Sequence, residues 1–344
     1  MGKKSLLKLN NQTDFPATLD CLYNLDGLDI FIITIKGTFT LADSLRLSDE
    51  QPAPARSDEY WGEEGLSSLR QGADVTLMKS GTDIIMTGNA CAPKGKKVRE
   101  LDVHLSVGPV SKTLKVIGER VWEPVLYALL PSKPELFDTM PLVYERAYGG
   151  VHEREEKTLS EPRNPSGRGF IGKRKKKELT GQPLPNIEDP DNLIRFTHDT
   201  PAPAGFGWIA PNWEPRKSLA GTGDQHWKKT RAPYPPEDCD RQFLQTAHPD
   251  LISTEPLKGG EAVHITNMSP DGDIRFDLPA VTFDVNAEFN DGSEVLDMSL
   301  ATVHLQPNER QVSLVWQGAV NGNKRRLGCQ SVTISNAIIK YPNT

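Results

Sequence analysis

Two aspartates and two histidines that could exchange protons lie close together in the second half of the chain. They are Asp224, His226, Asp238 and His248. Carboxylates and imidazoles are the groups that general acid–base catalysis requires, provided that the fold brings them to one substrate. Each also has an ordinary structural use, because aspartates begin helices and turns and His226 can pack beside Trp227. A hydrolase-like enzyme with its site in the 220–250 region therefore remains one interpretation.

Two further stretches match catalytic motifs only in part. Residues 167–174 read GRGFIGKR, which satisfies GxGxxG, but Arg174 stands where a phosphate-binding loop needs a hydroxyl, and no buried strand precedes the loop. Residues 152–156 begin like the zinc-protease motif HExxH, but Glu156 replaces the second histidine. The sequence also has no GxSxG nucleophile elbow. We therefore expect no cofactor, no metal and no covalent catalytic residue.

The cysteines and the apolar runs bear on the compartment. Cys21, Cys91, Cys239 and Cys329 are at least 70 residues apart, which favours reduced, mostly buried thiols over disulfides or a zinc site. No apolar run approaches the roughly 18 residues of a membrane-spanning helix, and the first ten residues lack the apolar core of a signal peptide. We expect a cytoplasmic protein without a membrane span.

The charge balance is mildly acidic. The chain has 40 Lys and Arg against 46 Asp and Glu, a net charge of −6, so it lacks the positive field that holds proteins on nucleic acid. We expect no nucleic-acid partner. The exception is a run of cations at 173–177 that includes Lys175, Lys176 and Lys177. Such a run is most simply a solvated loop, and its functional interpretation is contact with an acidic protein.

Strand-like runs at both ends of the chain predict an all-β fold with mainly antiparallel, sandwich-like sheets. In the N-terminal β region, residues 1–120, we expect strands at 29–41, 74–78, 83–90, 101–107 and 113–118. In the C-terminal β region, residues 257–344, we expect strands at 262–266, 273–278, 281–288, 295–305 and 311–319, packed with the N-terminal ones. One or two short helices are expected, at 57–70 and 236–247.

The middle of the chain, residues 121–256, has an unusual composition. It holds 18 of the 27 prolines and 13 of the 24 aromatic residues. Proline enrichment alone suggests disorder, but aromatic rings carry apolar surface that an ordered fold buries. The two together predict a long, ordered, irregular region that wraps over the sheets, and such regions usually bind something.

Short motifs follow one another in a fixed order through this middle region. They include PLVYERAYGG at 141–150, NPSGRGF at 164–170, LPNIE at 184–188, PAGFG at 203–207, WEPR at 213–216 and AGTGDQHW at 220–227. Over roughly residues 20–280 the chain resembles the domain of unknown function 2169 family. The motif residues, structural or binding, are Tyr144, Glu145, Arg146, Gly149, Gly150, Asn164, Gly167, Gly169, Asn186, Glu188, Gly221, Thr222, Asp224, Trp227 and Asp238.

The resemblance implies a non-catalytic function. Members of this family are encoded beside spike and toxin genes of type VI secretion systems and act as adaptors. It implies that this chain binds a toxin effector protein and loads it onto the VgrG spike protein. Exposed aromatic and arginine side chains suit such a surface. The candidate partner-binding residues are Trp208, Trp213, Arg216, Arg231 and Tyr234, together with Lys175, Lys176 and Lys177.

Each of these candidates also has a structural interpretation. The tryptophans could instead pin the loop region onto the sheet, because large aromatic rings are mostly buried. Glu145 and Arg146 could form a buried pair that orients the turn at Gly149 and Gly150. The glycines of the motifs most simply mark tight turns.

Overall fold

Strands dominate the structure. It is a computed structural model that describes residues 7–42, 45–155, 157–270, 272–321 and 329–342. Several mostly antiparallel sheets confirm the expected all-β fold. The described residues contain three short α-helices, rather than one or two: α1 (Lys176–Leu179), α2 (Arg216–Leu219) and α3 (Gln225–Thr230). No helix in these ranges is long and apolar enough to cross a membrane.

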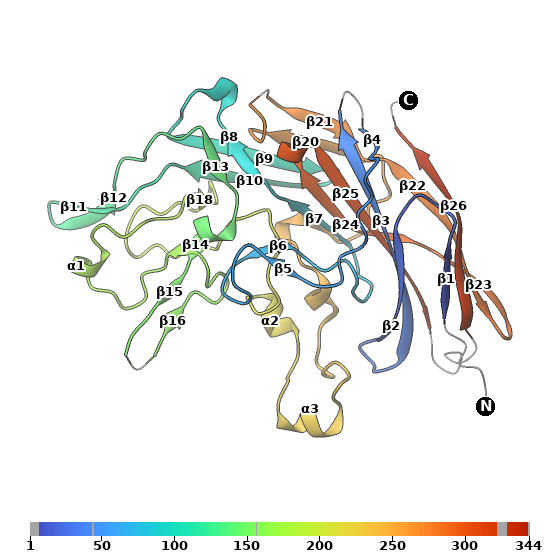
Figure 1. The fold of residues 1–344 in the computed structure, drawn as a ribbon. Helices are drawn as coiled ribbons and strands as arrows, with labels where there is room; N and C mark the ends of the chain where they lie inside the picture. Colours follow the sequence, from blue (N-terminus) through green and yellow to red (C-terminus); the bar gives the residue numbers. More distant parts are fainter. Residues whose placement is uncertain (1–6, 43–44, 156, 271, 322–328, 343–344) are drawn as a thin grey trace.

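The largest sheet has seven strands and joins both ends of the chain (Figure 1). Nine consecutive residues of its strand β3 (Asp29–Leu41) are buried, which indicates that both faces of this strand are covered. Residues of β3 pair with β25 (Gln311–Asn321) along the whole of that strand, so the two ends of the chain share one ladder. The other strands are β19 (Ile252–Ser253), β7 (Thr82–Met86), β24 (Ser299–Gln306), β2 (Ala17–Tyr23) and β4 (Leu45–Leu47).

Two smaller sheets complete the main body. One consists of β1 (Lys8–Asn11), β26 (Cys329–Lys340), β22 (Ala280–Phe289) and β23 (Gly292–Leu296). The other consists of β18 (Ile187–Glu188), β10 (Val110–Ile117), β9 (Glu100–Val107), β20 (Ala262–Thr266) and β21 (Ile274–Asp277). A single cluster of buried apolar side chains draws on all three sheets, for example through Phe31, Leu105 and Val285. This cluster is the main core.

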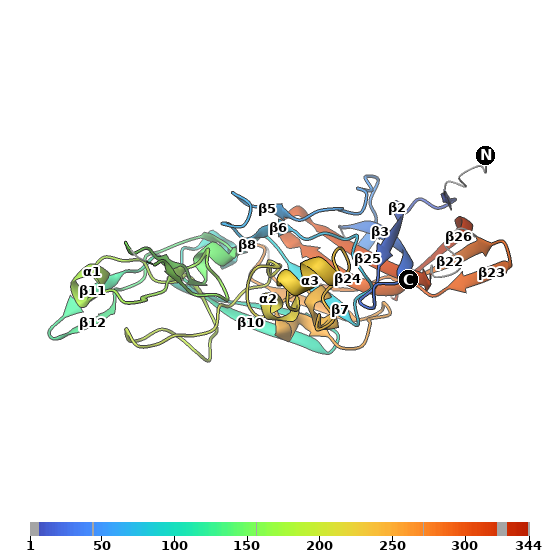
Figure 2. The ribbon, with the colours of Figure 1, turned by 90° about the horizontal axis from the view of Figure 1, so that it is seen from below.

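The remaining strands form two-stranded pairs. They are β5 (Glu59–Tyr60) with β6 (Leu69–Gln71), β8 (Asn89–Cys91) with β13 (Thr139–Pro141), β11 (Trp122–Val125) with β12 (Ala128–Pro131), β14 (Tyr148–Gly149) with β17 (Arg168–Gly169), and β15 (Val151–His152) with β16 (Leu159–Ser160). The pairs β11–β12 and β15–β16 lie with α1 at one end of an elongated molecule (Figures 1 and 2). A second, smaller apolar cluster supports this end: Trp122, Leu129, Tyr148, Leu179, Leu184 and Ile194.

Both helices predicted from the sequence are wrong. The segment 236–247 contains only a 3-10 turn, Arg241–Leu244. Its last residues are drawn into the body, where the Thr246 amide donates to the buried Asp83 carboxylate at 2.7 Å. An amide used in this way cannot close a helical turn.

The segment 57–70 likewise forms the strands β5 and β6 rather than a helix. Gly65 between them has a φ of +77°, a left-handed conformation that does not continue a helix. The Ser68 amide donates out of the segment, to the Glu145 carboxylate at 2.7 Å. Both observations explain why this Ser- and Glu-containing stretch turns back as a hairpin.

Other local predictions also need correction. Residues 74–78 form no strand, and the expected strand at 295–305 is divided, because β23 ends at Leu296 and β24 begins at Ser299. The strands β2 and β26 are absent from the sequence-based expectation. Only Cys329 of the four cysteines is buried, so the expectation that most of them are buried is wrong.

Candidate functional site

The two tryptophans predicted to bind a partner are part of the core. Trp208 is 2% exposed and its ring meets His304 edge to face at 4.5 Å between centroids. Trp213 is 0% exposed and meets Tyr144 in the same way at 5.6 Å. The Trp208 ring pins the loop region to β24, and Trp213 is buried in the main core, so the prediction that they offer a partner-binding surface is wrong.

Arg216 is buried as well. Its guanidinium group donates to the Ile209 carbonyl at 2.6 Å and to the Phe243 carbonyl at 3.1 Å. It also lies over the Phe243 ring, 5.1 Å from the ring centre. Arg216 therefore joins two loops of the body, which corrects its prediction as a partner-binding residue.

Asn164 is the centre of the motif region. Its buried amide group donates to the carbonyls of Tyr144 at 2.7 Å and Tyr148 at 3.0 Å. Asn164 also approaches two glycines closely. A Cβ on Gly149 would lie 2.1 Å from the backbone carbonyl oxygen of Asn164, and a Cβ on Gly167 would lie 2.4 Å from its side-chain Nδ2. Glycine is required at both positions because any side chain would collide with this crossing of chain segments.

Glu145 and Arg146 do not pair with each other as the sequence suggests. The Glu145 carboxylate accepts from the Ser68 amide and hydroxyl, both at 2.7 Å. Arg146 donates to Glu119 at 2.7 Å and to the Asn186 side chain at 3.0 Å. Glu145 therefore binds the segment at Ser68, whereas Arg146 binds the segments at Glu119 and Asn186.

The other polar motif residues of this region also have structural partners. The Asn186 side chain donates to the Ile117 carbonyl at 3.0 Å, and the buried Glu188 pairs with Arg120. Burial raises the pKa of the Glu188 carboxyl. In this part of the chain, the hydrogen bonds of the motif stabilise the crossing of loops and strands.

The motif residues from 221 onward lie in a different setting. They belong to a projection that we call the finger, residues 220–240, which carries α3 and extends from the body (Figure 1). Its two ends meet at the base, where the Asp240 amide donates to the Leu219 carbonyl at 2.9 Å. The Thr222 amide and hydroxyl donate to the Asp238 carboxylate at 2.8 and 2.6 Å, and these bonds lower the pKa of that carboxyl.

Further bonds hold the finger in shape. Asp224 caps α3 by accepting from the Trp227 amide at 2.8 Å, and the Trp227 ring N–H donates to the Tyr234 carbonyl at 2.8 Å. Arg231 reaches the body and donates to the Leu25 carbonyl at 2.7 Å. The Tyr234 ring rests edge to face on Tyr23, 4.7 Å between centroids. Arg231 and Tyr234 thus attach the finger to the turn between β2 and β3.

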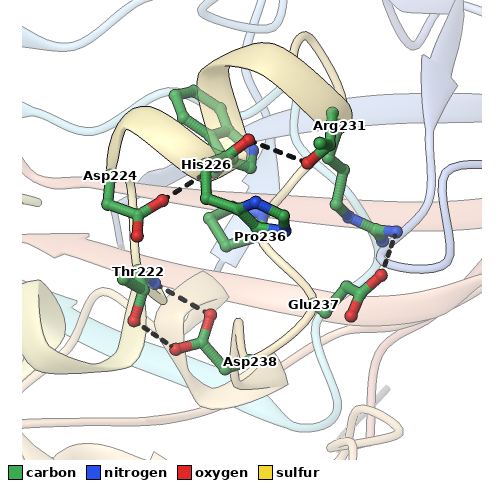
Figure 3. Close-up of a pocket in the computed structure, with 9 residues that line it drawn as sticks. Thr222, Asp224, His226, Arg231, Pro236, Glu237 and Asp238 are labelled. Carbon is green, nitrogen blue, oxygen red and sulfur yellow. Dashed lines mark hydrogen bonds and ion pairs between the residues drawn. The ribbon is translucent and has the colours of Figure 1, made fainter.

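A hollow of about 490 Å³ lies on the finger (Figure 3). Arg231 and Glu237 form an ion pair at 3.5 Å on one side of it, and the Thr222 to Asp238 bonds lie on another (Figure 3). The lining residues are Thr222, Asp224, His226, Trp227, Thr230, Arg231, Pro236, Glu237 and Asp238. Its walls combine an aromatic ring with charges of both signs.

The structure does not bring the four predicted acid–base residues to one place. Asp224, His226 and Asp238 line the hollow on the finger, whereas His248 lines a separate cavity of about 370 Å³ that Lys112 also lines. Burial and the nearby Lys112 charge lower the pKa of His248 to about 4. Within the described ranges, no three His, Cys, Asp or Glu side chains gather as metal ligands would.

The basic run lies far from the finger. Lys175, Lys176 and Lys177 are exposed at α1, and the Lys176 ammonium group donates to the Tyr127 carbonyl at 3.3 Å. Tyr127 and its neighbour Leu126 are almost fully exposed at the end of the β11–β12 hairpin, a feature that sequence reasoning missed. The available signal was two large apolar residues at the turn of a short hairpin.

One comparison with known proteins gives a match. The family model described as an uncharacterized protein conserved in bacteria (DUF2169) matches residues 26–317. The match extends further toward the C-terminus than the motifs in the sequence suggest. No curated protein and no solved structure matches the chain at the significance we required.

Proposed function

The chain belongs to the DUF2169 family, and from this premise we propose that it is a non-catalytic adaptor, which binds a toxin effector and loads it onto the VgrG spike. The finger is the observation that carries the proposal. Neither of the two buried apolar clusters in the described residues includes a residue from 220–240. The core therefore does not need the finger, although several hydrogen bonds keep it in one shape. Ordered surface features of this kind commonly serve binding.

The chemistry of the finger fits a partner that must be held and later released. Trp227 and Tyr234 present partly exposed rings, while Lys228, Lys229 and Glu237 are exposed around them. Aromatic anchors with a polar rim are the usual composition of a protein–protein interface. Because the finger is already ordered, it loses little conformational entropy when a partner binds.

The hydrolase-like alternative has less support. The carboxylates of Asp224 and Asp238 accept hydrogen bonds that hold the finger backbone, and His248 lines another cavity. A carboxylate that caps a helix can still act on a substrate, so a variant must separate the two functions.

Removing the finger tests the proposal. Residues 222–238 are replaced by Gly-Ser-Gly, which can bridge the gap because Leu219 and Asp240 are hydrogen-bonded at the base. We expect the variant to keep its β-sheet circular dichroism and to lose at least about tenfold in affinity for a purified candidate toxin effector of the same organism. Isothermal titration calorimetry measures the affinity.

The matched control changes an exposed surface elsewhere. Lys96→Glu with Lys97→Glu alters two adjacent exposed lysines after β8 and is expected to leave the toxin affinity unchanged. If the finger-less protein is folded and binds the toxin as tightly as the unaltered chain, the finger is not the binding surface. If the unaltered chain does not bind the toxin at all, the adaptor proposal itself fails.

A further inference from the structure

The hairpin β11–β12 presents two large apolar side chains at its tip. Val125 pairs with Ala128, so Leu126 and Tyr127 form a two-residue loop. Their exposed fractions are 94% and 97%, the highest among the large apolar residues of the described chain, and Val125 beside them is 44% exposed. Single exposed apolar residues are common, but two adjacent ones at the end of a projection are not explained by packing.

The local conformation does not explain them either. Leu126 has a φ of +52°, in the left-handed region that is unfavourable for residues with a Cβ atom. A two-residue hairpin loop with positive φ at its first position favours glycine at that position. The chain therefore carries leucine where backbone preference favours glycine, and two large apolar side chains where solubility favours polar ones.

The hairpin is held rigidly together with α1. Trp122 and Leu129 of the hairpin and Leu179 of α1 belong to the second buried cluster. The Trp122 carbonyl accepts from the Gly181 amide at 2.9 Å, and the Trp122 amide donates to the Gln182 carbonyl at 3.1 Å. This small core fixes where the exposed tip stands relative to the helix.

Positive charge stands directly beside the apolar tip. Lys175, Lys176 and Lys177 are exposed, and the contact of the Lys176 ammonium group with the Tyr127 carbonyl places α1 against the hairpin end. These cations occur on a chain whose net charge is −6. Their concentration at one end therefore complements an acidic partner.

We propose that Leu126, Tyr127 and the lysines of α1 form a docking surface for an acidic protein. An apolar pocket of that protein receives the two tip side chains, while carboxylates around the pocket face Lys175, Lys176 and Lys177. That this protein is one of the two that an adaptor joins rests on the proposed function.

A folded protein fits this surface better than an anionic membrane does. Glu123 on the same hairpin and Glu178 in α1 are exposed among the cations. A uniformly negative lipid surface repels both carboxylates, whereas a protein can place complementary groups opposite each one. The hairpin also stands well apart from the finger in both views of the molecule (Figures 1 and 2), so two partners can bind at once.

The test replaces both tip residues with a pair that suits the hairpin turn and removes the two apolar side chains. Leu126→Gly with Tyr127→Asn places glycine at the loop position with positive φ and a small polar residue after it, so the melting temperature should stay the same or rise. The probes are a purified candidate toxin effector and a purified VgrG spike protein of the same organism, each titrated separately. We expect the affinity for one of them to fall at least about thirtyfold and the affinity for the other to stay unchanged.

A second variant tests the charges. Lys175→Glu, Lys176→Glu and Lys177→Glu together should slow association with the same partner and weaken its salt dependence. The matched control reverses Lys94, Lys96 and Lys97, three exposed lysines elsewhere on the surface, and should leave the association rate within about twofold.

The possible failures are distinguishable. If the unaltered protein binds neither probe, the proposed function fails and this inference fails with it. If the unaltered protein binds a probe and the tip variant binds that probe with the same affinity as the unaltered protein, the docking surface alone is refuted. Binding of the unaltered protein, but not the tip variant, to phosphatidylserine-containing vesicles would also overturn the inference, because the surface would then be a membrane contact.

Discussion

At the scale of single residues, the polar side chains of the motif region hold backbone segments together. Asn164 joins the 3-10 turn at Tyr144 to β14 at Tyr148, and Asn186 joins its loop to the end of β10. Such bonds hold buried segments in place, and leaving a buried polar group unpaired is costly. The motif residues therefore mainly stabilise the crossing of the loops.

Replacing Asn164 by aspartate tests this interpretation. The Asn164→Asp change keeps the shape of the side chain but turns its NH₂ group into an oxygen that faces two carbonyls. We expect a loss of roughly 3 kcal/mol in the free energy of unfolding, because a buried charge is left without donors. Urea denaturation measures it, and Asn212→Asp at an exposed position should change stability by less than about 0.5 kcal/mol. Equal midpoints for the two variants would refute the structural assignment.

Residue types alone do not reveal which way a side chain faces. Trp208 and Trp213 lie in a Pro-rich loop region with the composition of an interface, and both are buried. Nothing in the sequence around Arg216 distinguishes it from an exposed arginine, but its side chain donates to two carbonyls of the body. These directions depend on contacts with distant strands, such as Trp208 with His304, which no local pattern encodes.

At the scale of elements, several strands follow from the sequence, but the long β26 and the short irregular elements do not. The predicted strands at 29–41 and 262–266 coincide with β3 and β20, because β-branched runs bounded by turn residues are a strong signal. The helix α3 has only six residues, too few for a periodic pattern. Its one usable signal is Asp224, a residue type that commonly caps helices.

That cap offers a way to separate structure from chemistry in the finger. Asp224→Ala removes the acceptor of the Trp227 amide, which should cost about 1 kcal/mol and raise hydrogen exchange at that amide about fivefold. Asp224→Ser keeps a capping oxygen and removes the carboxylate. The adaptor account predicts that the serine variant retains amide protection, toxin binding and toxin export.

The two accounts differ in the serine variant. An enzyme that uses the carboxylate of Asp224 would lose toxin export in the serine and alanine variants alike, with binding of the toxin unchanged. Hydrogen exchange read by mass spectrometry and a secretion assay on the same strains provide the comparison. Loss of export in a folded, toxin-binding Asp224→Ser protein would favour the hydrolase-like enzyme.

At the scale of the whole molecule, distant parts of the chain are assembled into one body. Lys8 of β1 pairs with Ser331 of β26, and Thr302 of β24 pairs with Asp83 of β7. Local patterns predict that such strands exist, but they cannot predict partners separated by hundreds of residues. The all-β class and the family were therefore accessible from the sequence, whereas the finger and the exposed hairpin tip required the assembled fold.

The arrangement gives the molecule two separate exposed features, the finger and the β11–β12 tip with α1, connected by one rigid body (Figures 1 and 2). A protein that only joins two others needs such a separation, because both partners must be held at once without colliding. An enzyme instead needs its reacting groups to converge: Asp224, His226 and Asp238 share the hollow on the finger, whereas His248 lines another cavity.

The most direct test of the central claim is native mass spectrometry of the protein mixed with a purified candidate toxin effector and a purified VgrG spike protein of the same organism. The adaptor account predicts one complex that contains all three chains, from which the toxin is released with its intact mass unchanged. A toxin recovered with an altered mass would show that the protein modifies it chemically. The absence of any complex containing both partners would show that the protein does not join them, and either result would contradict the account.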